Sequence, residues 1–316
     1  MTRQKETEII DLGVVIPVFE DQESFVRLLQ DVSRAIEAGS NRLHATVYAV
    51  DDGSPSPLKV EAREIPSNLN LAIERLHQNS GHQKAIFRGL ELAKQAEHTH
   101  FAVMDADGED DAWSLPQMIK KSRNCRNAVV VAQRGTRKRK TSFIMMYRLH
   151  RLAFRILTGK TLDFGNFMLV PRSRLERLLG GRAAQTHLAA TVLKSGLTIC
   201  KVPSPRPARF QGQSKMNLES LLSHSVAALS VFADTILVRV FLFSAASGAL
   251  VLVGLIGVVL IRLSWDQVEP GWATSAVGFM LLALLQLVSI LLLVTLFWVG
   301  LKKIDSGQLA GRPLKE

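Results

Sequence analysis

The stretch HFAVMDADG, residues 100–108, predicts a buried strand that ends in two carboxylates, Asp105 and Asp107. The residues before them are almost all apolar, as in a strand that is covered on both faces. Two aspartates that stand two residues apart in a turn can reach one cation, and hard ions such as Mg²⁺ and Mn²⁺ prefer oxygen ligands. The stretch therefore predicts a metal-binding turn, although acidic turns without a ligand are also common after strands.

Three further apolar runs, at residues 12–19, 45–50 and 128–132, also end in polar residues. Helix-spaced apolar residues lie between them, at 22–38 and 82–96, and strands that alternate with helices predict a parallel α/β sheet. Ligands of such sheets bind at the carboxyl ends of the strands. We therefore expect the polar residues that follow the strands to meet at one edge of the sheet.

Two long segments near the end of the chain, residues 240–261 and 273–300, contain no charged residue. Each exceeds the ~20 apolar residues that a helix needs to cross ~30 Å of hydrocarbon. Buried core helices are the alternative, but such helices rarely run so far without a polar face. We therefore predict two membrane spans.

The charges around these segments predict their orientation. Four basic residues follow the second span, whereas the connector at 262–272 is slightly acidic. Positive charge favours the cytoplasmic side, and the first ten residues lack the apolar core of a signal peptide. We predict a multi-pass protein of the inner cell membrane, with both termini and the soluble part in the cytoplasm. The predicted division is a soluble domain, an amphipathic juxtamembrane helix, and two spans with a short tail, at residues 1–215, 216–239 and 240–316.

Residues 141–158 predict an amphipathic helix, because Arg148, Arg151 and Arg155 alternate with apolar side chains. A basic amphipathic helix can lie in the headgroup region of a membrane. An ordinary helix with one core face and one solvated face fits the pattern equally well.

The composition excludes several classes of protein. The 316 residues include 39 Lys and Arg against 28 Asp and Glu, a net charge of +11, and 47% are hydrophobic. That hydrophobic fraction excludes a disordered chain. A nucleic-acid binder is disfavoured, because several basic residues flank the predicted membrane segments and no nucleic-acid motif is present. Cys125 and Cys200 cannot make a disulfide framework and lack metal-ligand spacing, which favours a reducing compartment.

Six short motifs follow one another between Val14 and Lys215: IPVFED, VDDGSP, NSGHQKAIFRGL, MDADGEDD, DFGNFMLVPR and RFQGQSK. With the two C-terminal spans, they resemble the family 2 glycosyltransferases of GT-A fold. The similarity is to the polyprenyl-phosphate glycosyltransferases related to dolichol-phosphate mannose synthase, in their bacterial membrane-anchored branch. The resemblance implies a GT-A domain with a mostly parallel, Rossmann-like sheet, followed by amphipathic helices and two transmembrane helices.

The resemblance also implies a set of site residues. The metal ligands, for Mg²⁺ or Mn²⁺, are Asp105, Asp107 and Glu109. Contacts to the nucleotide or to phosphate are implied for Pro17, Phe19, Asp21, Val50, Asp52, Lys84, Ala106, Arg134, Arg209, Ser214 and Lys215. Asn166 stands where this branch has an aspartate often proposed as catalytic, and Asp163, three residues upstream, is the candidate for a remaining acidic role.

The activity implied is inverting transfer of a sugar from a nucleotide sugar, UDP-glucose or GDP-mannose, to a polyprenyl phosphate at the cytoplasmic membrane face. A phosphate acceptor with a second pKa of ~6 is already ionised and hardly needs a general base. The resemblance also allows a homo-oligomer associated through the spans. Two alternatives stay open: a processive polysaccharide synthase, whose Gln-x-x-Arg-Trp motif and additional spans are not found here, and a non-enzymatic membrane-anchored scaffold with a degenerate site.

Overall fold

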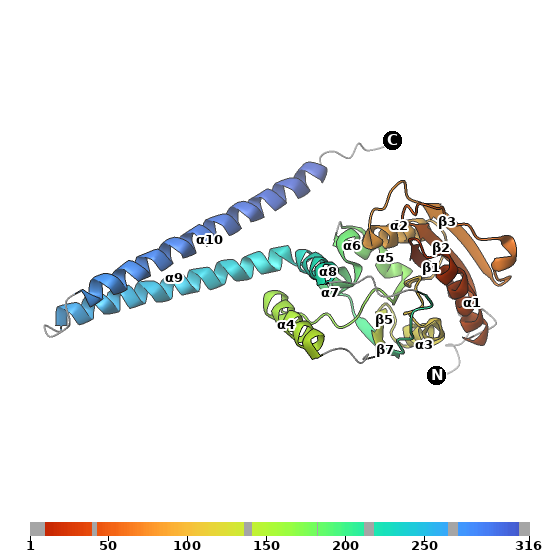
Figure 1. Ribbon diagram of the computed structural model, residues 1–316, viewed down its shortest axis with the longest axis horizontal. Coiled ribbons are helices and arrows are strands. Elements are labelled where there is room, and N and C mark those ends of the chain that lie inside the picture. The colour runs from red at the N-terminus through yellow and green to blue at the C-terminus, as the bar shows by residue number, and fades with distance from the viewer. Residues whose placement is uncertain are drawn as a thin grey trace. The chain divides into compact units, whose positions relative to one another are not determined.

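One seven-stranded sheet organises the N-terminal part of the chain in the computed structural model (Figure 1). The structure describes residues 10–39, 43–135, 141–181, 183–211, 218–264 and 271–309. The strand order is β3-β2-β1-β4-β6-β5-β7. The strands are β1 (Ile10–Val18), β2 (Leu43–Asp51), β3 (Leu69–Arg75), β4 (His100–Val103), β5 (Val129–Arg134), β6 (Met168–Pro171) and β7 (Ile199–Ser204).

The predicted mostly parallel sheet is confirmed. Only β6 runs antiparallel to its neighbours, β4 and β5, while the other paired strands are parallel. The central strand β1 is buried along almost its whole length, which explains its continuous apolar sequence. The sequence patterns missed β3, β6 and β7, because β6 has only four residues and the two edge strands carry exposed polar side chains.

Helices cover both faces of the sheet. One face packs against α1 (Gln22–Gly39) and α3 (Leu115–Asn124), through side chains such as Phe25 and Met118. The other face packs against α2 (His82–Lys94), α5 (Arg172–Leu179) and α7 (Leu188–Lys194), through side chains such as Ile86. The remaining short elements are η1 (Ala62–Glu64), η2 (Ala112–Ser114), α4 (Thr141–Thr158), α6 (Ala183–Thr186) and α8 (Leu218–Ser230).

The carboxyl ends of β2, β1 and β4 lie side by side, because these strands are parallel neighbours. The loops that follow them therefore meet at one edge, as the sequence predicts. The turn after β2 needs glycine, since Gly53 has φ 71° and a Cβ there would lie 2.4 Å from the carbonyl carbon of Gln78.

The chain divides into two compact units, Met1–Val231 and Phe232–Glu316. The second unit contains α9 (Ala233–Ser264) and α10 (Trp272–Leu309), which pack against each other. Both are long and apolar enough to cross a membrane, and they contain the predicted spans at 240–261 and 273–300. The predicted domain boundaries after residues 215 and 239 remain predictions, as does the orientation in the membrane.

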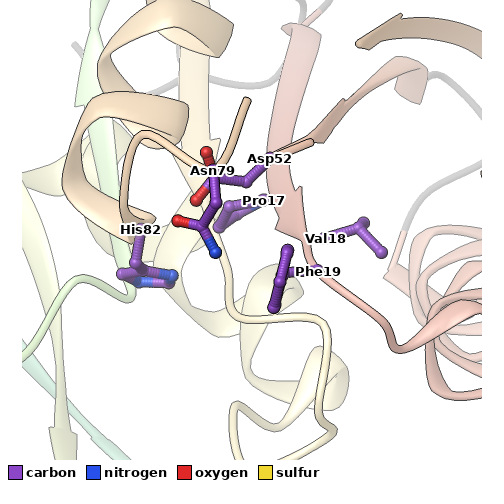
Figure 2. Close-up of a pocket in the computed structure, with 6 residues that line it drawn as sticks. All are labelled: Pro17, Val18, Phe19, Asp52, Asn79 and His82. Atoms are coloured by element: carbon purple, nitrogen blue, oxygen red, sulfur yellow. The ribbon is translucent and has the colours of Figure 1, made fainter. Parts of the chain in front are cut away.

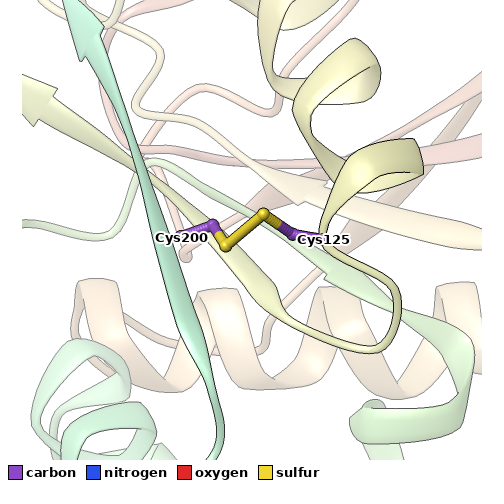
Figure 3. Close-up of a disulfide and its surroundings, with 2 residues drawn as sticks. All are labelled: Cys125 and Cys200. Atoms are coloured by element: carbon purple, nitrogen blue, oxygen red, sulfur yellow. A yellow bond between two sulfur atoms is a disulfide. The ribbon is translucent and has the colours of Figure 1, made fainter.

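The two cysteines are joined, a pairing that the sequence analysis did not predict. Cys125 at the end of α3 and Cys200 on β7 form a disulfide with a Cα–Cα separation of 6.8 Å (Figure 3). They are 75 residues apart in sequence, and only the packing of α3 against the edge strand β7 brings them together. Spacing alone therefore did not reveal the pair.

Candidate active site

A pocket lies at the carboxyl edge of the sheet, where β1 and β2 end. Its lining residues are Pro17, Val18, Phe19, Asp52, Asn79 and His82 (Figure 2). Three of them, Pro17, Phe19 and Asp52, are predicted nucleotide contacts. The pocket thus brings together residues from β1, from the end of β2 and from the start of α2.

Asp52 fixes the backbone of the loop that precedes α2 and borders this pocket. Its two carboxylate oxygens accept hydrogen bonds from the backbone N–H groups of Ser80 (2.8 Å) and Gly81 (3.0 Å). Its neighbour Asp51 is fully buried and accepts from the N–H groups of Ser54 and Leu58. The paired aspartates after β2 therefore shape two loops, and Asp52 also faces the pocket.

The residues after β4 form a second part of the site, which we call the acidic loop, residues 105–110. Asp110 is buried and accepts from the N–H of Asp105 at 3.0 Å, while Asp107 accepts from the N–H of Glu109 at 2.9 Å. These hydrogen bonds fix the conformation of the turn, in which four of the six residues carry a carboxylate. Gly108 has φ 80°, a conformation that favours glycine.

A segment that continues β7, residues 205–211, lies across the acidic loop, and we call it the strap. Arg206 donates to Glu109 and Arg209 donates to Asp107, while the Nε of Arg209 lies 3.8 Å from a Glu109 oxygen. The N–H of Phe210 bonds the carbonyl of Asp107 at 3.0 Å, and its ring would lie 2.5 Å from a Cβ at Gly108. The absence of a side chain at Gly108 therefore lets the strap approach.

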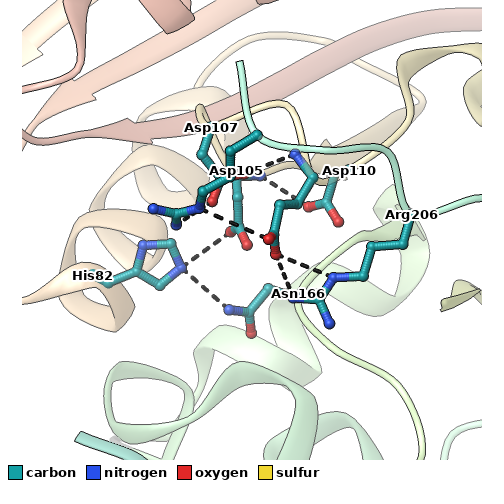
Figure 4. Close-up of polar contacts among 8 residues, drawn as sticks. His82, Asp105, Asp107, Asp110, Asn166 and Arg206 are labelled. Atoms are coloured by element: carbon teal, nitrogen blue, oxygen red, sulfur yellow. Dashed lines mark hydrogen bonds and ion pairs between the residues drawn. The ribbon is translucent and has the colours of Figure 1, made fainter. Parts of the chain in front are cut away.

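His82 connects the pocket to the acidic loop. Its Nε2 lies 3.2 Å from a carboxylate oxygen of Asp105 and 3.3 Å from the side-chain amide of Asn166 (Figure 4). His82 stands in the first turn of α2, whereas Asn166 precedes β6. Three elements far apart in the sequence therefore converge at one imidazole.

The charges of the acidic loop shift two pKa values. Burial raises the pKa of Asp107, the charge of Asp105 raises it further, and the N–H of Glu109 and Arg209 partly oppose the shift. Burial alone lowers the pKa of His82, but Asp105, followed by Asp110 and Asp107, outweighs burial and raises it. The loop thus concentrates negative charge that a cation stabilises.

The carboxylates of Asp105 and Asp107 fit a divalent metal ion. They supply hard oxygen donors, and burial, followed by the charge of Asp105, raises the pKa of Asp107. Among the described residues, no group of three or more His, Cys, Asp or Glu side chains is arranged to hold a metal. Two protein carboxylates with substrate phosphates and water are a usual Mg²⁺ set, and the metal roles of Asp105 and Asp107 stay predictions. The predicted metal role of Glu109 stays a prediction, because its carboxylate accepts from Arg206.

The other predicted residues lie at varying distances from this centre. Val50 is fully buried and its side chain packs near Gly89 of α2, so its predicted nucleotide contact stays a prediction. Ala106 is nearly buried in the acidic loop, Lys84 is exposed on α2, and the carbonyl of Asp21 accepts from Phe25 in the first turn of α1. The side chain of Arg134 and all of Ser214 and Lys215 lie outside the described residues.

The structure separates the two predicted catalytic residues. Asn166 is buried beside His82, with no hydrogen-bond partner for its Oδ1 in the described part of the chain. Asp163 instead pairs with Lys201 of β7 at 2.6 Å. Its role as the acidic residue of the site stays a prediction.

Sequence reasoning missed His82, Asn79 and Arg206. His82 and Asn79 lie in the NSGHQKAIFRGL motif. A glycine directly before a helix, as in this motif, is a signal for a ligand-binding loop that could have pointed to them. No pattern pointed to Arg206, because its partner Glu109 is 97 residues away.

Residues 13–178, more than half of the chain, match the family model described as glycosyl transferase family 2. The chain belongs to this family. The protein is therefore a glycosyltransferase.

Two characterised classes of transferase and one uncharacterized glycosyltransferase are similar to it. The chain is 28% identical to the uncharacterized glycosyltransferase YkoT of Bacillus subtilis (strain 168), over 88% of this chain and 84% of that protein. It is 24% identical to undecaprenyl-phosphate 4-deoxy-4-formamido-L-arabinose transferase of Enterobacter sp. (strain 638), over 89% and 84%. It is 28% identical to dodecaprenyl-phosphate galacturonate synthase of Rhizobium johnstonii, over 41% and 37%.

Among solved structures, the glycosyltransferase shares its fold with glucosyl-3-phosphoglycerate synthase of Mycobacterium tuberculosis. The TM-score is 0.50 at 13% identity, over 72% of this chain and 80% of that one. That synthase was solved with Mn²⁺, UDP-glucose and phosphoglyceric acid. The similarity supports the GT-A-like fold that the motifs predict.

Proposed function

We propose that this glycosyltransferase transfers a sugar, with inversion, from a nucleotide sugar to a polyprenyl phosphate at the cytoplasmic face of a membrane. The observation that carries the proposal is the meeting of the pocket, the carboxylates of Asp105 and Asp107, and two arginines at one sheet edge. His82 belongs to both the pocket and the acidic loop and so joins the two parts.

For the donor, Pro17, Phe19 and Asp52 line the place for the nucleotide. Asp105 and Asp107 would hold Mg²⁺ or Mn²⁺, which would supply Lewis-acid stabilisation of the diphosphate. UDP-glucose is the first choice of donor and GDP-mannose the second. The structural relative solved with Mn²⁺ and UDP-glucose supports this choice of ligand class.

For the acceptor, an anionic phosphate matches the chemistry of the strap. Arg206 and Arg209 carry guanidinium groups, which bind phosphate oxygens in a bidentate manner. Asn166 cannot take a proton, which suits a nucleophile that is already ionised. The relatives named for undecaprenyl- and dodecaprenyl-phosphate transfer support a lipid phosphate, as do two helices long and apolar enough to span a membrane.

We propose that α4 and α8 face the membrane surface near this site. Leu152 and Ile156 of α4 are exposed one turn apart, as are Leu222 and Val226 of α8, and the two helices contact each other. The exposed Arg148, Arg151 and Arg155 of α4 add positive charge. Apolar burial together with attraction to anionic lipid favours such a placement.

The test is transfer by the full chain in membranes. Radiolabelled UDP- or GDP-sugar is mixed with Mn²⁺ and undecaprenyl phosphate, and label is measured in the chloroform-soluble, mild-acid-labile fraction. Undecaprenol without phosphate is the acceptor control, and Asp107→Asn is the variant control.

We expect lipid-linked label with the phosphate, at least a hundredfold less with Asp107→Asn, and none with undecaprenol. Label in polymer instead supports the processive synthase. No transfer from any donor, with a folded protein, overturns the proposal and favours the scaffold.

A further inference from the structure

The disulfide lies between the two elements that carry the acidic loop and the strap. The acidic loop runs through η2 directly into α3, which ends at Cys125. β7, which contains Cys200, runs directly into the strap. The bond, drawn in Figure 3, therefore links α3 and β7 at one end, while their other ends lead to the acidic loop and the strap.

A second tie joins these same elements at their near ends. The hydroxyls of Ser114, at the start of α3, and Ser204, at the end of β7, are 2.9 Å apart and both are buried. Beyond Ser204 come Arg206 and Arg209, with their ion pairs to the acidic loop. α3 and β7 are thus held together at both ends, by a covalent bond at one and a hydrogen bond at the other.

β7 depends on these ties more than an inner strand does. It is one of the two edge strands of the sheet and pairs only with β5. Edge strands lack a second row of ladder hydrogen bonds, so they open locally more easily than central strands. A change at Cys200 therefore acts on a strand with a single neighbour, five residues before the strap begins.

Both cysteines are half-buried rather than sealed in the core, so small thiols and thiol proteins can reach the bond. In a reducing cytosol, disulfides are rare, and those present are usually transient or redox-sensing. The inference rests on the cytoplasmic placement given under the proposed function: there, one disulfide between the two elements that carry the acidic loop and the strap fits the redox-sensing class.

We infer that Cys125 and Cys200 form a reversible redox pair that sets the mobility of the strap over the acidic loop. Reduction breaks the S–S bond and adds two electrons and two protons, giving two thiols, while a dithiol reductant becomes its own disulfide. Oxidation by a disulfide-class oxidant reverses the step and releases the two protons. In the oxidised form the strap is held, and in the reduced form β7 and the strap open more often.

Hydrogen–deuterium exchange of the full chain in detergent, oxidised or reduced with dithiothreitol, tests this inference without relying on transfer activity. We expect peptides covering residues 199–211 to exchange at least threefold faster after reduction, while peptides covering β1 and β2 stay unchanged. Cys125→Ser/Cys200→Ser should show the fast rate with and without reductant. Ser114→Ala, which keeps the disulfide, should still respond to reductant. Equal exchange in the oxidised and reduced wild type overturns the inference.

Reversibility is tested in cells by tagging thiols with a maleimide of known mass. We expect both thiols to be tagged in untreated cells and both to be protected after treatment with diamide. A pair that stays tagged after diamide, or that is already protected before treatment, overturns the redox role. Both experiments can fail while lipid transfer is retained, so their failure is distinct from failure of the proposed function.

Discussion

The ion pair of Arg206 with Glu109 should be one of the stronger electrostatic interactions in the protein. The Glu109 side chain is 9% exposed and the Arg206 side chain 21%, so water screens the pair little. Replacement of Arg206 by Met leaves Glu109 with Arg209 at 3.8 Å and removes its closest guanidinium. Removal of one partner of a buried pair costs about 3 kcal/mol. The melting temperature should fall by roughly 6–12 °C.

The double-mutant cycle separates pairing from packing. Glu109→Gln should cost about 1 kcal/mol, because Arg206 keeps some contact with solvent. The double variant should also lose only about 1 kcal/mol, since replacing both charges leaves none uncompensated. The coupling energy is then about 3 kcal/mol, obtained from chemical denaturation of the full chain in detergent. The matched control is Lys94 with Glu176, whose side chains are 42% and 78% exposed and which should couple by about 0.5 kcal/mol or less.

The same variants decide the role of Glu109 toward the metal. If its carboxylate chiefly balances the arginines, Glu109→Gln should keep Mn²⁺ affinity within about threefold, whereas Asp107→Asn should lose it. Electron paramagnetic resonance of free Mn²⁺ measures both. A coupling energy under about 0.5 kcal/mol, or a Glu109→Gln variant that binds Mn²⁺ as poorly as Asp107→Asn, refutes this reasoning.

Three further outcomes are expected. Because the pKa of Asp107 is raised in the folded protein, ionisation of Asp107 opposes folding. The free energy of unfolding of the wild type should therefore fall relative to that of Asp107→Asn as the pH rises through that pKa. Mn²⁺ should raise the melting temperature of the wild type only. Gly108→Ala should lower the free energy of unfolding by about 1–2 kcal/mol, because position 108 has a left-handed backbone. The new Cβ should also displace the Phe210 ring, which would appear as faster proteolysis of the strap. Gly196→Ala is the control for the backbone cost alone, because Gly196 has φ 69° and no atom lies within 4 Å of the place that a Cβ would take. Burial lowers the pKa of His187 from 6.5 to about 3, so about 2 kcal/mol of stability should be lost between pH 7.5 and 5.0, and His187→Asn should flatten this dependence in thermal unfolding.

The parts of the fold that sequence predicted are those with a strong local signal. β1 and β4 are continuous apolar runs, and α1 repeats its buried side chains Phe25, Leu29 and Ile36 at helical spacing. α9 and α10 are predicted by length and apolar composition alone. In each case the local sequence pattern matches the environment of the element in the structure, so the element could be predicted from the sequence alone.

The contacts that sequence left out are those between residues far apart in the chain. Asn166 and His82 are 84 residues apart, and Cys125 and Cys200 are 75 apart. No periodicity encodes such a meeting, because it follows from the order of the strands. β6 enters antiparallel between β4 and β5 and so carries Asn166 to the acidic loop, an arrangement that no local pattern could indicate.

This dependence on topology also explains why the roles of Asn166 and Glu109 can be interpreted only from the residues that they contact. Taken alone, an asparagine in place of an aspartate suggests a lost catalytic group, and a glutamate after two aspartates suggests a third metal ligand. In the structure the amide faces an imidazole that already contacts Asp105, and the glutamate faces two guanidinium groups. A second carboxylate at position 166 would add a negative charge beside Asp105, whereas the amide of Asn166 adds none. The site therefore balances its charge through residues from α2, β4, β6 and β7 jointly, and a change at any one of them is best interpreted with its partners.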